Sequence, residues 1–198
     1  HMPAFAYQHT YALAALYPYA TQMANGEWAM QGEFGYTFKR KTPLGGKYGT
    51  NLKLNISYIR AIDREPVTDG KLMGTDGYTS SFFKFGDETY YQDINLQLEK
   101  KISQAFKINL MYMNQRYNQG VIEGHGGMIN SDIFVGEGKY QFNKKLTLRG
   151  ELQYLTTSHE SGDWMYGLLE LSVLPYMMFT VSDMYGKPSI SGGMEYGE

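Results

Sequence analysis

The sequence contains no cysteine, which excludes disulfide bonds, thiolate metal sites and cysteine nucleophiles. It has no excess of one charge, because 18 Lys and Arg stand against 20 Asp and Glu for a net charge of −2. The sequence therefore lacks the basic surplus that would indicate nucleic acid as a partner. Long apolar runs are also missing: the run from Tyr11 to Tyr17 is far shorter than the ~20 residues that a helix needs to cross a bilayer.

Aromatic residues and glycine are abundant, with 18 Tyr, 10 Phe and 23 Gly in 198 residues. This composition favours strands joined by tight bends over helical bundles. The length suits one domain with a sizeable core. We interpret His1-Met2 as a cloning remnant, so that a missing signal peptide indicates little. Residues 3–198 are then predicted to form a single β-barrel domain or a segment of a barrel.

Apolar and polar residues alternate along most of the chain, which is typical of strands with two unlike faces. In the stretch from Glu27 to Lys39, Trp28, Phe34 and Phe38 lie on one face and Glu33 lies on the other. About ten strands are expected on this basis: Tyr7–Tyr17, Glu27–Lys39, Tyr48–Tyr58, Asp93–Glu99, Phe106–Tyr112, Phe134–Phe142, Leu146–Tyr154, Trp164–Val173, Met177–Met184 and Ser189–Tyr196.

The connections between these strands alternate in length. The short ones are Arg40–Lys47, Lys100–Ser103, Asn143–Lys145 and Leu174–Tyr176, and the long ones are Pro18–Gly26, Ala61–Glu88, Tyr117–Asn130 and Ser158–Gly162. In an up-and-down meander every second connection lies at the same end, so the short turns are expected to gather at one rim. The short turns are rich in Lys, whereas the 61–88 loop is acidic. Short turns at one rim and long loops at the other are typical of outer-membrane barrels.

Alternation alone does not say which face is buried. A membrane barrel exposes its apolar face to lipid, whereas a soluble barrel turns it inward. The membrane is favoured by the longest strand runs, which reach ten to thirteen residues, by aromatics toward the strand ends and by charged polar faces. The sequence thus predicts an all-β protein, an antiparallel up-and-down β-barrel of about ten strands or a contiguous part of a larger one. The alternative is a soluble β-barrel that binds an apolar small molecule.

Three sequence segments resemble an uncharacterised outer-membrane β-barrel family of Bacteroides-type bacteria: Tyr11–Gln22, Thr42–Thr50 and Leu168–Ser172. The likeness covers most of residues 3–185. The resemblance implies a barrel in the outer membrane of a Gram-negative bacterium, and it implies no activity or functional residues. Members of that family are longer than this chain. Barrels of this class usually end on an aromatic residue, whereas this chain ends Tyr196-Gly197-Glu198, so we expect a segment of a longer barrel.

The polar faces supply the candidate functional residues. Charged positions expected to face the lumen are Glu33, Lys53, Asp93, Lys107, Glu137, Lys139, Arg149 and Glu151. One hypothesis is that they pair across strands, because unpaired charge in a narrow barrel is costly. The other is that they line a selective passage. We favour pairing, because about ten strands enclose a lumen that side chains largely fill.

Neither a catalytic site nor a metal site is predicted. The pairs Glu123/His125 and His159/Glu160 offer two metal ligands each, fewer than a zinc site requires. The run from Ser158 to Ser161 contains the residue types of a hydrolase triad, but neighbouring positions in a loop are not expected to orient one. An outer-membrane hydrolase is therefore the least supported function. We predict a protein without enzymatic activity or cofactor, with a structural or passive transport role, whose partners are the lipid bilayer and further barrel strands or subunits.

Overall fold

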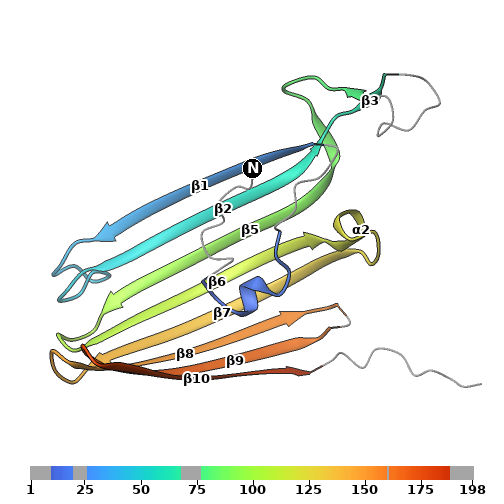
Figure 1. Ribbon diagram of the computed structural model, residues 1–198. Coiled ribbons are helices and arrows are strands. Elements are labelled where there is room, and N and C mark those ends of the chain that lie inside the picture. The colour runs from blue at the N-terminus through green and yellow to red at the C-terminus, as the bar shows by residue number, and fades with distance from the viewer. Residues whose placement is uncertain (1–9, 20–25, 68–76, 160, 188–198) are drawn as a thin grey trace, which may run out of the picture.

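The computed structural model describes residues 10–19, 26–67, 77–159 and 161–187 (Figure 1). This part of the chain is almost entirely β-structure, with a 3₁₀ turn and one short α-helix. The elements are η1 (Leu13–Ala15), β1 (Glu27–Phe38), β2 (Thr50–Ile62), β3 (Glu65–Pro66), β4 (Tyr78–Thr79), β5 (Phe85–Lys101), β6 (Phe106–Asn118), α2 (Gln119–Ile122), β7 (Met128–Gln141), β8 (Leu146–Thr157), β9 (Asp163–Val173) and β10 (Met177–Lys187).

Eight long strands form one antiparallel sheet in the order β1-β2-β5-β6-β7-β8-β9-β10, and β3 pairs with β4 in a small separate hairpin. The sheet is a meander, because each long strand pairs with the next one along the chain. Among the described residues β1 and β10 do not pair with each other, so they form the two edges of an open, curved sheet (Figure 1). The predicted antiparallel all-β fold is confirmed at this level.

The strand register sorts the side chains into two faces. One row crosses all eight strands and is entirely apolar or aromatic: Phe34, Leu54, Leu96, Tyr112, Phe134, Tyr154, Met165 and Tyr185. The neighbouring row, on the opposite face, begins Glu33, Asn55, Asn95 and continues with Met113, Ile133, Leu155 and Trp164. We call the first face the outer face and the second the inner face. They differ in exposure: Phe34 is 68% exposed, whereas Asn55 is fully buried.

A segment near the N-terminus covers the inner face. Residues 10–19 form a turn and the short helix η1, and Tyr11, Leu13, Ala14 and Tyr19 within it are buried. The predicted strand Tyr7–Tyr17 is therefore wrong in its described part. The physical reason is that the segment is apolar at consecutive positions instead of every second one, so it is buried on several sides as a compact turn. The predicted strand Ser189–Tyr196 lies outside the described residues.

The meander order confirms that short and long connections lie at opposite rims (Figure 1). The turns β1–β2, β5–β6, β7–β8 and β9–β10 share one rim, and the connections β2–β5, β6–β7 and β8–β9 share the other. The long connection after β2 is shorter than predicted, because β5 begins at Phe85 and the β3–β4 hairpin folds within it. The part of Pro18–Gly26 at 20–25 lies outside the described residues.

Candidate functional site

All eight predicted lumen charges lie on the inner face. Strands β1, β2, β5 and β6 each carry one of them, and β7 and β8 each carry two; in chain order they are Glu33, Lys53, Asp93, Lys107, Glu137, Lys139, Arg149 and Glu151. The inner face is therefore the candidate site. Most of these charges lie in the half toward the short turns, whereas the half toward the long loops mixes apolar side chains with the buried polar residues Asp93, Gln115 and Ser131.

Arg149 is the centre of the charged half. Its guanidinium donates to Glu137 at 3.0 Å and to Glu151, and it lies 3.8 Å from Glu170 on the next strand. Glu137 and Glu151 face each other across β7 and β8, so two carboxylates would repel without the cation between them. Arg149 is partly shielded, with 27% of its side chain exposed, and Glu151 is buried. The arrangement supports the pairing hypothesis for these three predicted residues. Sequence analysis missed Glu170 as the third partner.

The other predicted charges are less uniformly paired. Lys107 donates to Glu99 at 2.8 Å across β5 and β6. Among the described residues, no ion pair involves Glu33, Lys53, Asp93 or Lys139. Asp93 is fully buried and accepts a hydrogen bond from Asn95 at 2.8 Å on one oxygen. The inner face thus combines charges held in ion pairs with a buried carboxylate held by hydrogen bonds.

Amide side chains of the sheet hold the N-terminal segment. Gln153 accepts a hydrogen bond from the backbone N–H of Leu13 at 2.9 Å, and Gln115 donates to the carbonyl oxygen of Ala14 at 3.1 Å. Asn109 donates to the hydroxyl of Tyr11 at 2.8 Å. Because these three amides come from β6 and β8, the segment is fixed across the middle of the sheet. It occupies the space that the sheet curves around.

Apolar contacts strengthen the same docking. One buried cluster joins the segment to the middle strands and consists of Tyr11, Leu13, Ala14, Met111, Met113, Ile133, Val135 and Leu155. A second cluster lies nearer the long loops and consists of Tyr19, Ile59, Ala61, Tyr90, Tyr91, Tyr117 and Ile129. Sequence analysis missed both clusters. The signal was present, because the alternation breaks into consecutive apolar residues at Met111–Met113, Ile133–Val135 and Tyr90-Tyr91, which places apolar side chains on both faces.

The end of the segment is tied to the first strand by a hydrogen bond from the hydroxyl of Tyr19 to Glu27. Burial, and then the bond to this carboxylate, raise the pKa of Tyr19. The ring of Tyr19 also lies 5.8 Å from that of Tyr91, centre to centre. The hydroxyl therefore stays protonated as a donor, and the segment is anchored at both of its described ends.

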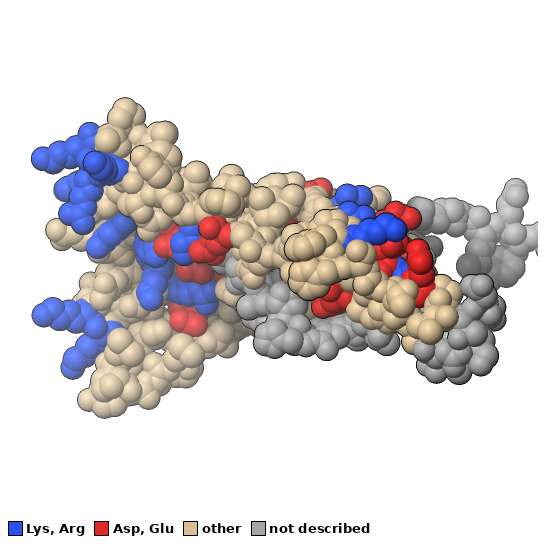
Figure 2. Space-filling model, turned by 90° about the horizontal axis from the view of Figure 1, so that it is seen from above, with Lys and Arg blue, Asp and Glu red and all other residues tan. Residues whose placement is uncertain are grey.

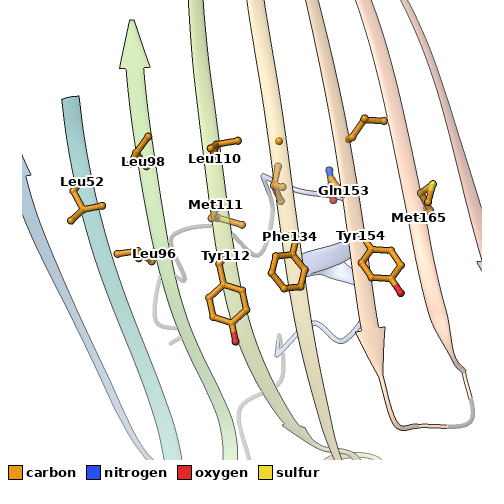
Figure 3. Close-up of a pocket in the computed structure, with 13 residues that line it drawn as sticks. Leu52, Leu96, Leu98, Leu110, Met111, Tyr112, Phe134, Gln153, Tyr154 and Met165 are labelled. Atoms are coloured by element: carbon orange, nitrogen blue, oxygen red, sulfur yellow. The ribbon is translucent and has the colours of Figure 1, made fainter. Parts of the chain in front are cut away.

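The outer face carries an open apolar depression of about 650 Å³ across the middle strands (Figure 3). Leu96, Leu110, Tyr112, Phe134 and Tyr154 project from this side of the sheet, and the N-terminal segment lies behind it. Gly136 has no side chain to fill the row between Leu110 and Leu152, which leaves the surface hollowed there. Among the described residues that border the depression, the polar side-chain groups on this face are the hydroxyls of Tyr112 and Tyr154, because the side chain of Gln153 points to the inner face and binds Leu13 there.

The histidines form no metal centre in the described part of the chain. His125 lies 3.2 Å from Glu123, and no group of three His, Cys, Asp or Glu converges among the described residues. His1, His9 and Glu160 lie outside them. Ser161 Oγ lies 3.2 Å from His159 Nδ1, so a Ser and a His of the run Ser158–Ser161 are within hydrogen-bond reach, and the expectation that this run orients no triad stays a prediction. The backbone N–H of Ser161 also points to that nitrogen at 3.4 Å, so the contact is a local turn.

Neither of the two helices in the described residues is long and apolar enough to cross a membrane. The fold defines a class, an all-β protein built on one antiparallel meander with an apolar exposed face and an opposite face of mixed polarity, which the N-terminal segment covers in part. The chain belongs to the family of unknown function DUF6029, whose model matches residues 1–196. Comparison with the curated proteins gave no match, and comparison with the solved structures gave none.

Proposed function

We propose that this chain is an outer-membrane β-barrel protein, or a contiguous part of one, with a structural or passive transport role and no catalytic activity. The observation that carries the proposal is the inverted distribution of polarity. Phe34, Leu152 and Val181 on the outer face are 68%, 68% and 74% exposed, whereas Asn55, Asp93 and Gln153 on the inner face are at most 2% exposed. A soluble sheet would cover the first set and leave the second in water.

The continuity of the outer face adds support. One apolar row crosses all eight strands without a charged residue, from Phe34 on β1 to Tyr185 on β10. In the hydrocarbon layer of a membrane such a row can stay exposed to lipid. The hydrogen bonds between neighbouring strands satisfy the backbone groups of every strand except the two edges. Strands of 11 to 17 residues also reach the ~9–11 residues that a tilted strand needs to cross a bilayer.

Closure of the sheet belongs to the proposal. The edges at β1 and β10 expose backbone donors and acceptors that cannot face lipid, so further strands or a second subunit must complete the sheet. The soluble alternative, a barrel that binds an apolar small molecule, would need apolar side chains around an interior cavity. The interior side of this sheet instead carries Arg149, Glu137 and Asp93, and its apolar part is already occupied by Leu13 and Tyr11.

The test is membrane integration. The full chain, refolded from urea in the presence of phosphatidylcholine vesicles, should float with the vesicles after washing with alkaline carbonate and with urea. Leu96→Arg, which places a charge in the middle of the outer face, should reduce integration, because an Arg or Lys on a lipid-facing barrel position costs about 2–4 kcal/mol near the midplane. Lys84→Glu in the long loop is the control. A chain that stays in the aqueous fraction as a folded monomer and binds an apolar probe would support the soluble alternative.

A further inference from the structure

The rim formed by the short turns is strongly positive. It carries eight cations and no carboxylate in the turns and in the last two residues of β5, at 39–49, 100–105, 142–145 and 174–176. Figure 2 shows these side chains projecting from one end of the molecule, at the left of the view. We call them the basic rim: Lys39, Arg40, Lys41, Lys47, Lys100, Lys101, Lys144 and Lys145.

The charge of the basic rim is not neutralised within the described residues, where none of its eight members forms an ion pair. The opposite rim differs. There Lys84 binds Asp63 at 2.6 Å, and the hydrogen bond and charge of Asp63 raise the pKa of Lys84. His125 lies 3.2 Å from Glu123 at the same rim. Eight like charges gathered without counter-charges repel one another, so the basic rim is matched to an anionic partner.

Aromatic side chains lie directly beside these cations. The rings of Tyr36 and Phe38 lie 4.9 Å apart at the end of β1, and those of Tyr140 and Phe142 lie 4.9 Å apart at the end of β7. The Nζ atoms of Lys47 and Lys101 each lie 5.5 Å from the ring centre of Tyr48. Aromatic rings followed by cations at the end of an apolar surface are the arrangement found where a bilayer changes from acyl chains to headgroup phosphates.

From this arrangement we infer that the basic rim binds the headgroup phosphates of anionic phospholipids in the leaflet around the short turns. The inference rests on the proposed function and names a partner for it. Charge complementarity alone would also suit a nucleic acid. The rim, however, continues without a polar boundary into the apolar outer face, and Lys100 itself lies on that face in line with Leu98 and Leu96. A lipid satisfies both surfaces at once, since its phosphate meets the cations and its chains meet the aromatic and aliphatic residues.

The test uses the full chain in phosphatidylcholine membranes that contain a trace of spin-labelled lipid. The motionally restricted fraction of labelled phosphatidylglycerol is compared with that of labelled phosphatidylcholine. Wild-type protein should select phosphatidylglycerol by about fivefold, the scale expected for one cation at an anionic surface. The pair Lys144→Gln and Lys145→Gln should reduce the selection toward equality, because Asn143 keeps that turn through its bonds to the backbone of residues 145 and 146. The matched control, Arg64→Gln with Lys84→Gln at the opposite rim, should leave it unchanged.

Each other outcome has a distinct meaning. Equal restricted fractions for the two lipids would overturn the lipid assignment and leave the proposed function standing. A membrane sample with no restricted component for either lipid would overturn the proposed function itself. Added sodium chloride should reduce the selection by screening. If inorganic phosphate at matched ionic strength abolished the selection while chloride did not, the rim would be a site for free phosphate and the lipid assignment would be wrong.

Discussion

The backbone N–H of Leu13 donates to the side-chain oxygen of Gln153 at 2.9 Å, which joins two residues 140 positions apart in the chain. Gln153 is 2% exposed and Leu13 is fully buried, so neither group has water as an alternative partner. The bond fixes the N-terminal segment against β8. The N-terminal segment is therefore packed against the inner face as an integral part of the fold.

Replacing Gln153 by Leu should loosen this segment. The substitution keeps the size of the side chain but leaves the N–H of Leu13 buried without an acceptor, at a cost of about 1–3 kcal/mol. Hydrogen exchange at Leu13 should accelerate, and the urea midpoint should fall. Gln141→Leu, at an exposed position on the same face, is the control and should change neither. Unchanged exchange at Leu13 in Gln153→Leu would show that the segment is held by other contacts.

Arg149→Ala should destabilise the fold. Removing the guanidinium leaves Glu137, Glu151 and Glu170 close together without a cation, and the partial exposure of the site suggests a cost near the lower end of the scale for buried pairs, about 3 kcal/mol. Urea unfolding of the reconstituted protein measures this. Lys139→Ala is the matched control, because it removes the neighbouring cation, which has no ion pair among the described residues. An Arg149→Ala protein of unchanged stability but altered ion selectivity would support a passage lined by charge instead.

The topology predicts unequal cleavage by trypsin in intact cells. Lys84 lies in the long connection before β5 and its side chain is 62% exposed, so it should be cut from outside. Lys100-Lys101 and Lys144-Lys145 lie at the opposite rim and should be spared until the outer membrane is permeabilised. Immunoblotting of the fragments distinguishes the sites. Cleavage only at the two Lys pairs would reverse the orientation.

The full chain should conduct little or no current in a planar bilayer. The segment at residues 10–19 occupies the middle of the inner face, and the Arg149 cluster spans β7 to β9, so side chains fill the space that ions would cross. A chain without residues 3–19 should give larger or more frequent current steps. Large, steady steps from the full chain would contradict a filled interior.

Much of the fold follows from the sequence because alternation and turn chemistry are local signals. The start of β1 at Glu27 and the start of β8 at Leu146 coincide with the changes in pattern. The segregation of short turns follows from connection lengths alone. The strand ends near the long loops were predicted less accurately. Strand β5 begins at Phe85 because its pairing with β2 continues through two register shifts, which a strict alternation of polar and apolar residues does not reveal.

The candidate site was predictable in part. The alternation of side chains along a strand is enough to predict that Glu137 and Arg149 point to the inner face. The pairing of Arg149 with Glu170 depends in addition on the register between β8 and β9. The docking of Leu13 and Tyr11 was not predictable, because their bonds span 140 and 98 positions of the chain and are made by amide side chains that resemble ordinary polar-face residues in the sequence. Consecutive apolar residues at Met111–Met113 were the available hint.

The central claim is that the outer face contacts lipid while the inner face does not, and the absence of cysteine allows a direct measurement. Single cysteines placed along β1 at residues 31 to 36, labelled with an environment-sensitive fluorophore in vesicles, should alternate in their quenching by brominated lipid. Phe34→Cys and Gly32→Cys should be quenched, and Glu33→Cys and Gln31→Cys should not. The same alternation should appear around Tyr112 on β6. Quenching of the inner positions, or of neither set, would contradict the account.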